Sequence, residues 1–297
     1  MSFHRPSSDR VSRRPRLALL LALVALAAAP AALAGDPPAA PAPNPGPGPG
    51  DVLAIGEKAP DLTATDLEGK PFALATARAL TADDALAAVN AAAKALGATA
   101  ALAATDGLEK VPGLKGDAGL VKAKVVALAI AAGRAHGLVA DETTVADWKT
   151  VGDVATWVGK AAEAPIVFVC WSPKCPTSKL FEERLVTAAA RRGARMYLVA
   201  SNATDAADDI KSYVETKELP FRVLLDGEQK LTDVFGGKRT PHVFVLDAKN
   251  VLRYAGTVDN DAPMTEPEEK RVAYLDLALG ALAEGRLPEI LMTTPVG

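Results

Sequence analysis

The two cysteines of the chain lie five positions apart in the stretch CWSPKCPTSKLFEERL, residues 170–185. A cysteine thiolate attacks peroxides and disulfides, and a dithiol redox motif places two residues between its two cysteines. The residue three positions after Cys175 is Ser178, and Cys170 lies on the opposite side. Two-thiol exchange within a Cys-x-x-Cys motif is therefore not available, and a nucleophilic Cys175 would act without a partner in the motif.

Cys175 stands directly before a predicted helix that opens near Pro176. The free N–H groups and the positive end of a helix dipole favour a thiolate, and proline suits the first helical turn because its missing N–H costs nothing there. Lys174 and Lys179 add positive charge nearby, and Trp171 and Lys174 are candidate tuning residues. The alternative is that Cys175 is a buried, inert cysteine.

Cys170 ends a continuous apolar run, residues 165–170, which predicts a strand buried on both faces. Five residues of turning chain separate it from Cys175, which would place the two Cα atoms beyond disulfide reach unless the loop rearranges. Cys170 is therefore either a core cysteine or a resolving or regulatory thiol, and the sequence leaves both open.

Alternating strand and helix patterns follow this run and predict an α/β fold with a mixed sheet. The expected strands are 195–200 and 222–225, with a hairpin from 243–247 and 251–255. Expected helices are 179–192 (Leu180, Phe181, Leu185 and Ala188 on one face), 205–217, 228–235 and 268–283. Upstream, two short strands are expected around a turn at Glu68-Gly69.

Residues 76–162 interrupt this pattern, and a structureless loop of that length is improbable in a compact domain. Apolar residues recur there at helical spacing, and Thr150 with Asp153 has the spacing of a capping box. The segment is predicted to be an inserted small all-α bundle with its own core.

The amino terminus is predicted to be a signal peptide over residues 1–34, with a basic leader, an apolar run and a small-residue cleavage site. An uncleaved membrane anchor is the alternative. Residues 35–51 are rich in proline and glycine and predict a disordered linker. These segments together predict a periplasmic or secreted protein.

The composition argues against several other classes of function. The 297-residue chain has a net charge of −3, which gives no basic surface for nucleic acid. Its histidines and cysteines do not cluster, so no metal site is expected, and the glycine pairs fit no phosphate-loop spacing, so no cofactor is expected. His136 is more typical of a surface or capping residue than of a ligand.

Three segments, in order, carry a family resemblance: GEKAPDLTATDLEGKPFAL, VFVCWSPKCPTSKLFEERL and GGKRTPHVFVLDAKNVLRYAGTVDN. The chain resembles the redoxin (alkyl hydroperoxide reductase/thiol-specific antioxidant) group of thioredoxin-like proteins over about residues 55–75 and 165–285. The resemblance implies a mixed sheet flanked by helices. It predicts a redoxin domain made of residues 52–75 and 163–297, with the helical insertion between them.

The same resemblance implies roles for individual residues. Thr240-Pro241 would be the threonine and cis-proline that face the nucleophilic Cys175. The hydroxyl of Ser172 would be placed to orient a peroxide. His242, beside the proline, is a candidate tuning residue, although a strand-start histidine with no role is the alternative.

Departures from the family pattern put peroxidase efficiency in doubt. Phe168 stands where the family's proline is expected, and no arginine lies between Asp226 and Lys230, which leaves Lys230 as the nearest substitute. Some members carry a cysteine just after a terminal Pro-Val-Gly. This sequence stops at Pro295-Val296-Gly297, so no resolving thiol is expected there.

The insertion weakly resembles an acyl-carrier-protein domain, but the position of the serine that would carry phosphopantetheine is Gly119. A standard carrier role is therefore excluded. The insertion would instead cover the edge of the active site or bind a protein partner.

The sequence therefore predicts an extracytoplasmic thioredoxin-like thiol oxidoreductase. Cys175 would attack a peroxide or disulfide, and an external thiol or thioredoxin-like reductant would resolve the product. One alternative is a one-cysteine peroxiredoxin-type peroxidase. The other is a non-catalytic binding module that keeps the fold and binds partners through the insertion.

Overall fold

The computed structural model describes residues 52–116 and 118–297. The expected signal peptide at 1–34 and linker at 35–51 lie outside these residues. Within the described ranges, no helix combines the length and apolar character needed to cross a membrane.

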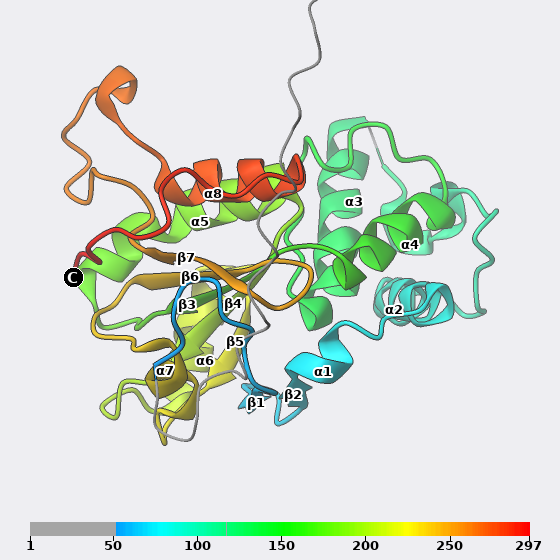
Figure 1. The fold of residues 1–297 in the computed structure, drawn as a ribbon. Coiled ribbons are helices and arrows are strands. Elements are labelled where there is room, and N and C mark those ends of the chain that lie inside the picture. The colour runs from blue at the N-terminus through cyan, green and yellow to red at the C-terminus, as the bar shows by residue number, and fades with distance from the viewer. Residues whose placement is uncertain (1–51, 117) are drawn as a thin grey trace, which may run out of the picture. The chain divides into compact units, whose positions relative to one another are not determined.

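A seven-stranded mixed sheet forms the centre of the fold, in the order β2-β1-β5-β4-β3-β6-β7 (Figure 1). Its strands are β1 (Thr63–Asp66), β2 (Pro71–Ala73), β3 (Ile166–Cys170), β4 (Arg195–Ala200), β5 (Arg222–Leu225), β6 (His242–Leu246) and β7 (Leu252–Gly256). Strands β3, β4 and β5 are parallel, while β6 and β7 run antiparallel to their neighbours. The expected α/β fold with a mixed sheet is confirmed.

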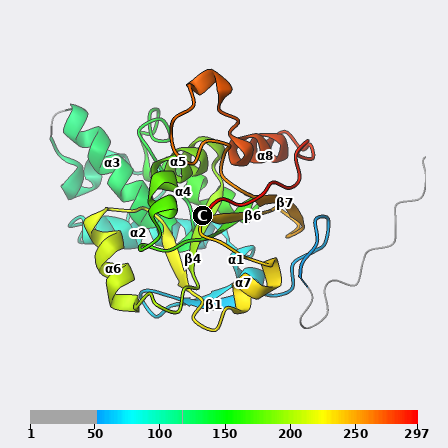
Figure 2. The same cartoon turned by 90° about the vertical axis from the view of Figure 1, so that its left-hand side faces the viewer.

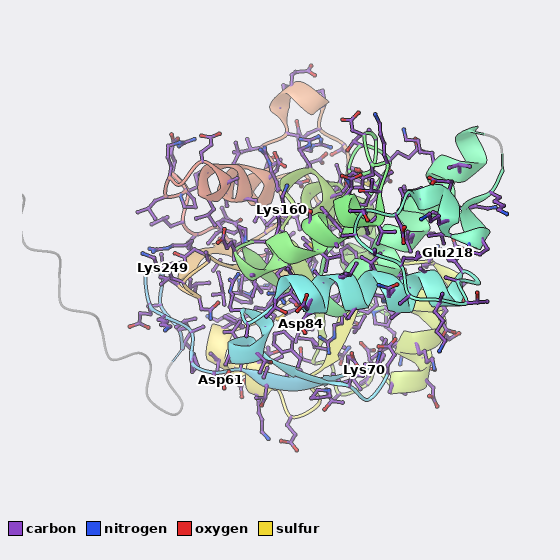
Figure 3. The ribbon with its side chains drawn as sticks, turned by 90° about the vertical axis from the view of Figure 1, so that its right-hand side faces the viewer. Asp61, Lys70, Asp84, Lys160, Glu218 and Lys249 are labelled. Atoms are coloured by element: carbon purple, nitrogen blue, oxygen red, sulfur yellow. The ribbon has the colours of Figure 1, made fainter. Side chains whose placement is uncertain are left out.

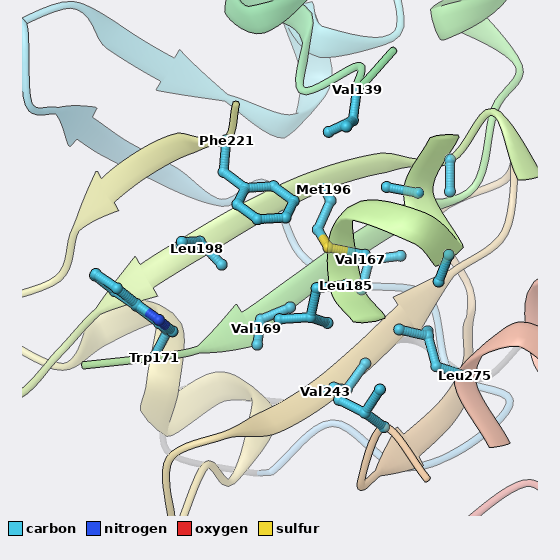
Figure 4. Close-up of a cluster of buried hydrophobic side chains, with 14 of the residues drawn as sticks. Val139, Val167, Val169, Trp171, Leu185, Met196, Leu198, Phe221, Val243 and Leu275 are labelled. Carbon is cyan, nitrogen blue, oxygen red and sulfur yellow. The ribbon is translucent and has the colours of Figure 1, made fainter. Parts of the chain in front are cut away.

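Helices follow the strands in the order expected: α5 (Pro176–Arg192), α6 (Ala207–Thr216), α7 (Lys230–Phe235) and α8 (Tyr274–Ala283). Alternate residues of β3 contact opposite layers, because successive side chains of a strand point to opposite faces. Val167 and Val169 pack in one cluster with Leu185 of α5 and Leu275 of α8 (Figure 4). Phe168 and Cys170 pack in the other.

Helix α5 begins at Pro176, as predicted from the residues after Cys175 and three residues before the apolar pattern that starts at 179, because Cys175 caps it and Pro176 occupies its first position. It ends at Arg192 and is capped by Gly193, whose φ of +60° is the left-handed conformation that glycine adopts freely. Phe181 and Leu185 are buried as predicted, but Leu180 is 42 % exposed. That assignment was wrong because Leu180 lies one position, about 100° of helix rotation, away from Phe181.

The last helix begins at Tyr274 rather than at 268, and Glu268–Lys270 forms only a short 3₁₀ turn. Asn260 accounts for the difference. Its side chain donates to the carbonyl of Lys270 and accepts from the N–H of Val272 at 2.7 Å, so these backbone groups are satisfied outside a helix.

The stretch between β2 and β3 is helical, as its periodicity predicted. It contains α1 (Leu74–Ala77), α2 (Ala82–Ala95), α3 (Ala118–Gly133) and α4 (Val151–Gly159). Residues of α2, α3 and α4 form a separate apolar cluster, whereas Leu74 of α1 packs in the cluster that contains Phe168. Thr150 and Asp153 form the predicted capping box, and Thr81 forms another with Asp84, labelled at the start of α2 in Figure 3. The domain limits at residues 76 and 162 stay a prediction.

Two arginines, Arg195 (buried) and Arg78 (partly buried), connect these helices to the sheet. The guanidinium of Arg195 on β4 is 1 % exposed and donates to the carbonyls of His136, Ala77 and Ala161. Arg78, which follows α1, donates to the carbonyls of Ala162, Ala164 and Asp247.

Candidate active site

The Cys175 side chain lies at the amino-terminal end of α5 and is partly exposed. Its sulfur accepts from the backbone N–H of Ser178 at 3.5 Å and donates to the carbonyl oxygen of Thr240 at 3.0 Å. The first contact is a helix cap, and the second joins the helix to the loop that leads into β6. The structure therefore brings Cys175 and Thr240 together.

The turn before Cys175 is fixed by its own backbone. The N–H of Cys175 donates to the carbonyl of Ser172 at 3.2 Å, and the Ser172 hydroxyl accepts from the N–H of Lys174 at 3.2 Å. Ser172 is fully buried. Its hydroxyl thus holds the loop that presents the thiol.

The Thr240–Pro241 peptide bond is cis, as the resemblance implied. Residues of β6 pair with β3 in antiparallel register, and Cys170 lies opposite His242. Because this pairing aligns the end of β3 with the start of β6, the residues just before β6 face the loop that leads to Cys175. Sheet register thus places Thr240 at the thiol.

Partial burial raises the pKa of the Cys175 thiol, but hydrogen bonds with Thr240, Ser178 and Thr177 lower it, and the net pKa is below the ordinary value. A thiol donates to the Thr240 carbonyl only while it is protonated. The Ser178 hydroxyl has no partner at hydrogen-bonding distance. The Thr240 side chain and the backbone N–H groups of Ser178 and Thr177 at the helix end together favour the thiolate.

Lys174, predicted to tune the thiol, extends toward the loop before α6. Its ammonium donates to the carbonyl of Thr204 and lies 3.7 Å from Asp205 and 3.4 Å from Asp209. Its charge is therefore shared with two carboxylates.

Trp171, another candidate tuning residue, is buried and donates from its indole nitrogen to Glu182 at 3.0 Å. The same carboxylate accepts from the hydroxyl of Tyr213 on α6 at 3.1 Å. Burial raises the pKa of Glu182, and burial beside that carboxylate raises the pKa of Tyr213 to about 12. Sequence reasoning missed Glu182, and the only available signal was a carboxylate two helical turns beyond Cys175, on the same side of the helix as buried Ser178 and Leu185.

Cys170 occupies a different environment from Cys175, and both cysteines are free. Its sulfur lies 3.9 Å from the hydroxyl of Thr232, and a Cβ added at Gly237 would stand 2.9 Å from it. Burial raises the pKa of the Cys170 thiol to about 12. These features are those of a core cysteine.

His242 is buried against Phe244, with ring centroids 4.2 Å apart. Its Nδ1 atom is buried without a hydrogen-bond partner. Burial lowers the pKa of His242 to about 4, with a further contribution from Lys238. The imidazole is therefore neutral at pH 7.

The remaining predicted positions lie apart from the thiol. Phe168 packs in the aromatic cluster of the opposite layer, between Phe72 and Phe235. Lys230 is exposed and paired with Glu228. Within residues 52–116 and 118–297, no three His, Cys, Asp or Glu side chains gather closely enough to hold a metal ion.

A pocket of about 300 Å³ lies between α5, α8 and the loop after β7, lined by residues that include Arg184, Asp259 and Arg271. Cys175 is not part of its lining. The thiol site is instead a surface site at the end of a helix.

Part of the chain is similar to a known protein family. Residues 158–273 match the Redoxin family model. No curated protein matches the chain. Among solved structures, a hypothetical protein from Sinorhizobium meliloti 1021 is 16 % identical with a TM-score of 0.45, covering 83 % of this chain and 91 % of its own.

Two further solved structures are similar to the chain. A peroxidoxin from Mycobacterium tuberculosis is 11 % identical, with a TM-score of 0.37, 78 % of this chain covered and 97 % of its own. The thioredoxin domain of a thiol-disulfide oxidoreductase from Bacteroides vulgatus is 13 % identical, with a TM-score of 0.33. The match covers 67 % of this chain and 86 % of that structure's chain. Residues 158–273 are thus similar to the Redoxin family, and the mixed sheet flanked by helices is consistent with a thioredoxin-like fold.

Proposed function

We propose that the protein is a thiol oxidoreductase of the extracytoplasmic space, in which Cys175 alone attacks a peroxide or a disulfide. The observation that carries the proposal is the position of the Cys175 sulfur. It lies at the amino-terminal end of α5, 3.0 Å from the carbonyl of Thr240 before the cis-proline, with a lowered pKa. A non-catalytic binding module has no need of such a thiol.

The resting thiol donates its proton to Thr240 O, and loss of that proton frees the sulfur from the carbonyl. The resulting thiolate is held by the N–H of Ser178, already at 3.5 Å. Deprotonation therefore ends the hydrogen bond from the sulfur to Thr240 O and leaves the sulfur as the acceptor of N–H groups at the helix end. This change leaves a sulfur lone pair available to a substrate on the exposed side.

With a peroxide, the thiolate attacks one oxygen, the O–O bond breaks, and a sulfenic acid forms as hydroxide or alkoxide leaves and takes a proton from water. An external thiol then displaces water from the sulfenic acid to give a mixed disulfide. A second external thiol attacks that disulfide, releases the Cys175 thiol and leaves as the oxidised external disulfide. With a disulfide substrate, thiolate attack gives the mixed disulfide directly.

Resolution must come from outside, because neither nearby position provides a second reactive thiol. Ser178 occupies the place of the second cysteine of a Cys-x-x-Cys motif. Cys170 is buried, and its pKa of about 12 leaves almost no thiolate at neutral pH. An external thiol or a thioredoxin-like reductant is therefore the expected partner.

The test is the rate of iodoacetamide alkylation against pH, on protein that begins at residue 36. Cys175 should react with an apparent pKa below the value of about 8.5 for a free thiol. One equivalent of hydrogen peroxide should add one oxygen to the intact mass, and external thiol should remove it. Cys170→Ser should behave as the parent protein does, whereas Cys175→Ser should lose both reactions. An ordinary thiol pKa with no oxidation would overturn the proposal.

The extracytoplasmic location rests on residues 1–34. In a bacterial host that exports the full chain, the mature protein should begin just after residue 34 by mass and fractionate with the periplasm or medium. Full-length protein that stays in the cytoplasm would contradict this part of the proposal.

A further inference from the structure

The last residues of the chain return to the thiol site. The segment after α8 runs beside the outer edge of β7: Ala255 N–H donates to Leu291 O at 3.1 Å, and Thr293 N–H donates to Ala255 O at 3.0 Å. In Figure 2 the end of the chain, marked C, faces the viewer. Backbone pairing therefore fixes the direction from which residues 295–297 leave the sheet.

Thr293 anchors the segment. Its hydroxyl lies 2.7 Å from the hydroxyl of Tyr254 and accepts from the N–H of Thr257 at 3.0 Å. A Cβ at Gly256 would stand 2.1 Å from this hydroxyl, so glycine is required for the close approach. The segment is thus held in place just before its last four residues.

Residues 295–297 lie against the loop that faces Cys175. Val296 packs on the apolar cluster that contains Trp171 and Phe181. A Cβ added at Gly297 would stand 2.3 Å from the carbonyl oxygen of Thr240, the acceptor of the Cys175 thiol. Arg239 donates to the main-chain oxygen of Gly297. One residue, Thr240, therefore touches both the reactive sulfur and the tail.

We propose that residues 295–297 form one wall of the substrate site at Cys175 and restrict the thiol to small oxidants. This inference rests on the proposed function and names its substrate class: low-molecular-weight peroxides and disulfides. A disulfide in a folded protein brings a stretch of polypeptide with it, and that stretch would meet the tail on Thr240. A small oxidant reaches the exposed side of the sulfur without displacing the tail.

Three variants release the tail in different ways. A chain ending at Thr294 removes residues 295–297 but keeps the pairing with β7 and the Thr293 anchor. Gly297→Ala adds the Cβ that collides with Thr240 O. Arg239→Ala removes the hydrogen bond to Gly297. Arg286→Ala is the matched control, because this exposed arginine pairs with Glu284 instead.

The measurement compares alkylation of Cys175 by iodoacetamide with alkylation by a polyethylene glycol maleimide, at a pH above the thiol pKa. Release of the tail should raise the rate with the bulky reagent, relative to the small one, by about tenfold, equivalent to ~1.4 kcal/mol of barrier. The rate of reaction with a disulfide-linked peptide should rise in parallel with the rate of bulky alkylation. The rate of oxidation by peroxide should change by less than about twofold. Arg286→Ala should leave all ratios unchanged.

An unchanged ratio in the shortened chain, with normal peroxide oxidation, would overturn the role of the tail and leave the proposed function intact. Alkylation needs no redox chemistry, so the two proposals fail separately. If peroxide and disulfides leave Cys175 unmodified while the alkylation ratio rises, the proposed function is wrong and the tail still controls access.

Discussion

Cys175 lies partly exposed at the start of α5, whereas Cys170, at the end of β3, is buried beside Thr232. The two thiols differ only in position, but their pKa values move in opposite directions. Burial outweighs every other effect at Cys170, while hydrogen bonds with Thr240, Ser178 and Thr177 outweigh partial burial at Cys175. The reactivity of Cys175 is therefore set by its position at a helix end beside Thr240. The charge of Lys174 contributes little, because its ammonium lies near Asp205 and Asp209.

His242 allows a pH-dependent test at the scale of one residue. Its pKa in the folded protein is about 4, below the ordinary 6.5, so the unfolded chain binds more protons between these values. Stability therefore falls as pH decreases through this window. Between pH 7 and pH 5 the parent protein should lose about 2 kcal/mol more of its unfolding free energy than His242→Gln, which cannot titrate.

Urea unfolding at the two pH values measures this difference. The buried Nδ1 atom without a partner is the physical reason, because an imidazolium would need an acceptor there. Equal pH dependence in parent and variant would show that His242 is not held neutral by the fold.

At the scale of elements, the strands were predicted most accurately. The limits of β4 and β5 match the expected 195–200 and 222–225, because each strand is a short run of mostly apolar residues after a single arginine. The start of α8 was missed because the side chain of Asn260, distant in sequence, satisfies backbone groups that a helix would use. Helix ends depend on such long-range contacts, whereas buried strands depend on local composition.

The features of the candidate site likewise fall into those that local sequence predicts and those that depend on contacts between elements. Cys175, the cap and the cis-proline follow from local sequence and a family resemblance. The contacts of Trp171 with Glu182 and of Lys174 with Asp205 join separate elements, and no local pattern predicts them. The contact of Gly297 with Thr240 is of the same kind.

The two capping boxes of the helical stretch provide the prediction for this scale. Thr81 caps α2 with Asp84, and Thr150 caps α4 with Asp153. Thr150→Ala should lower the unfolding free energy by about 1 kcal/mol, and Thr81→Ala by about the same amount. Chemical denaturation measures both. Thr187→Ala, in the exposed middle of α5, is the control and should change stability by less than about 0.5 kcal/mol.

At the scale of the whole molecule, the helices between β2 and β3 and the sheet are joined by polar contacts to the backbone. Arg195 reaches three carbonyls from the helical stretch and also donates to the hydroxyl of Tyr197 at 2.6 Å. The Tyr197 hydroxyl donates to His136 O at 2.9 Å. A buried guanidinium suits this junction because its fixed fork of donors can satisfy several acceptors at once.

Arg195→Met should therefore cost on the order of 3 kcal/mol of unfolding free energy or more, because it leaves buried carbonyls without donors. Arg195→Lys should recover only part of the loss, since one ammonium cannot reproduce the fork. Arg191→Met, which removes a guanidinium that is 61 % exposed and pairs with Asp276, is the matched control and should cost less than about 1 kcal/mol. In Arg195→Met, the amides of α3 and α4 should lose protection from hydrogen exchange before those of β3 do. The reason is that the helices have their own core, while the strand lies at the centre of the sheet. Equal loss in Arg195→Met and Arg191→Met would mean that apolar packing, rather than this arginine, holds the helices on the sheet.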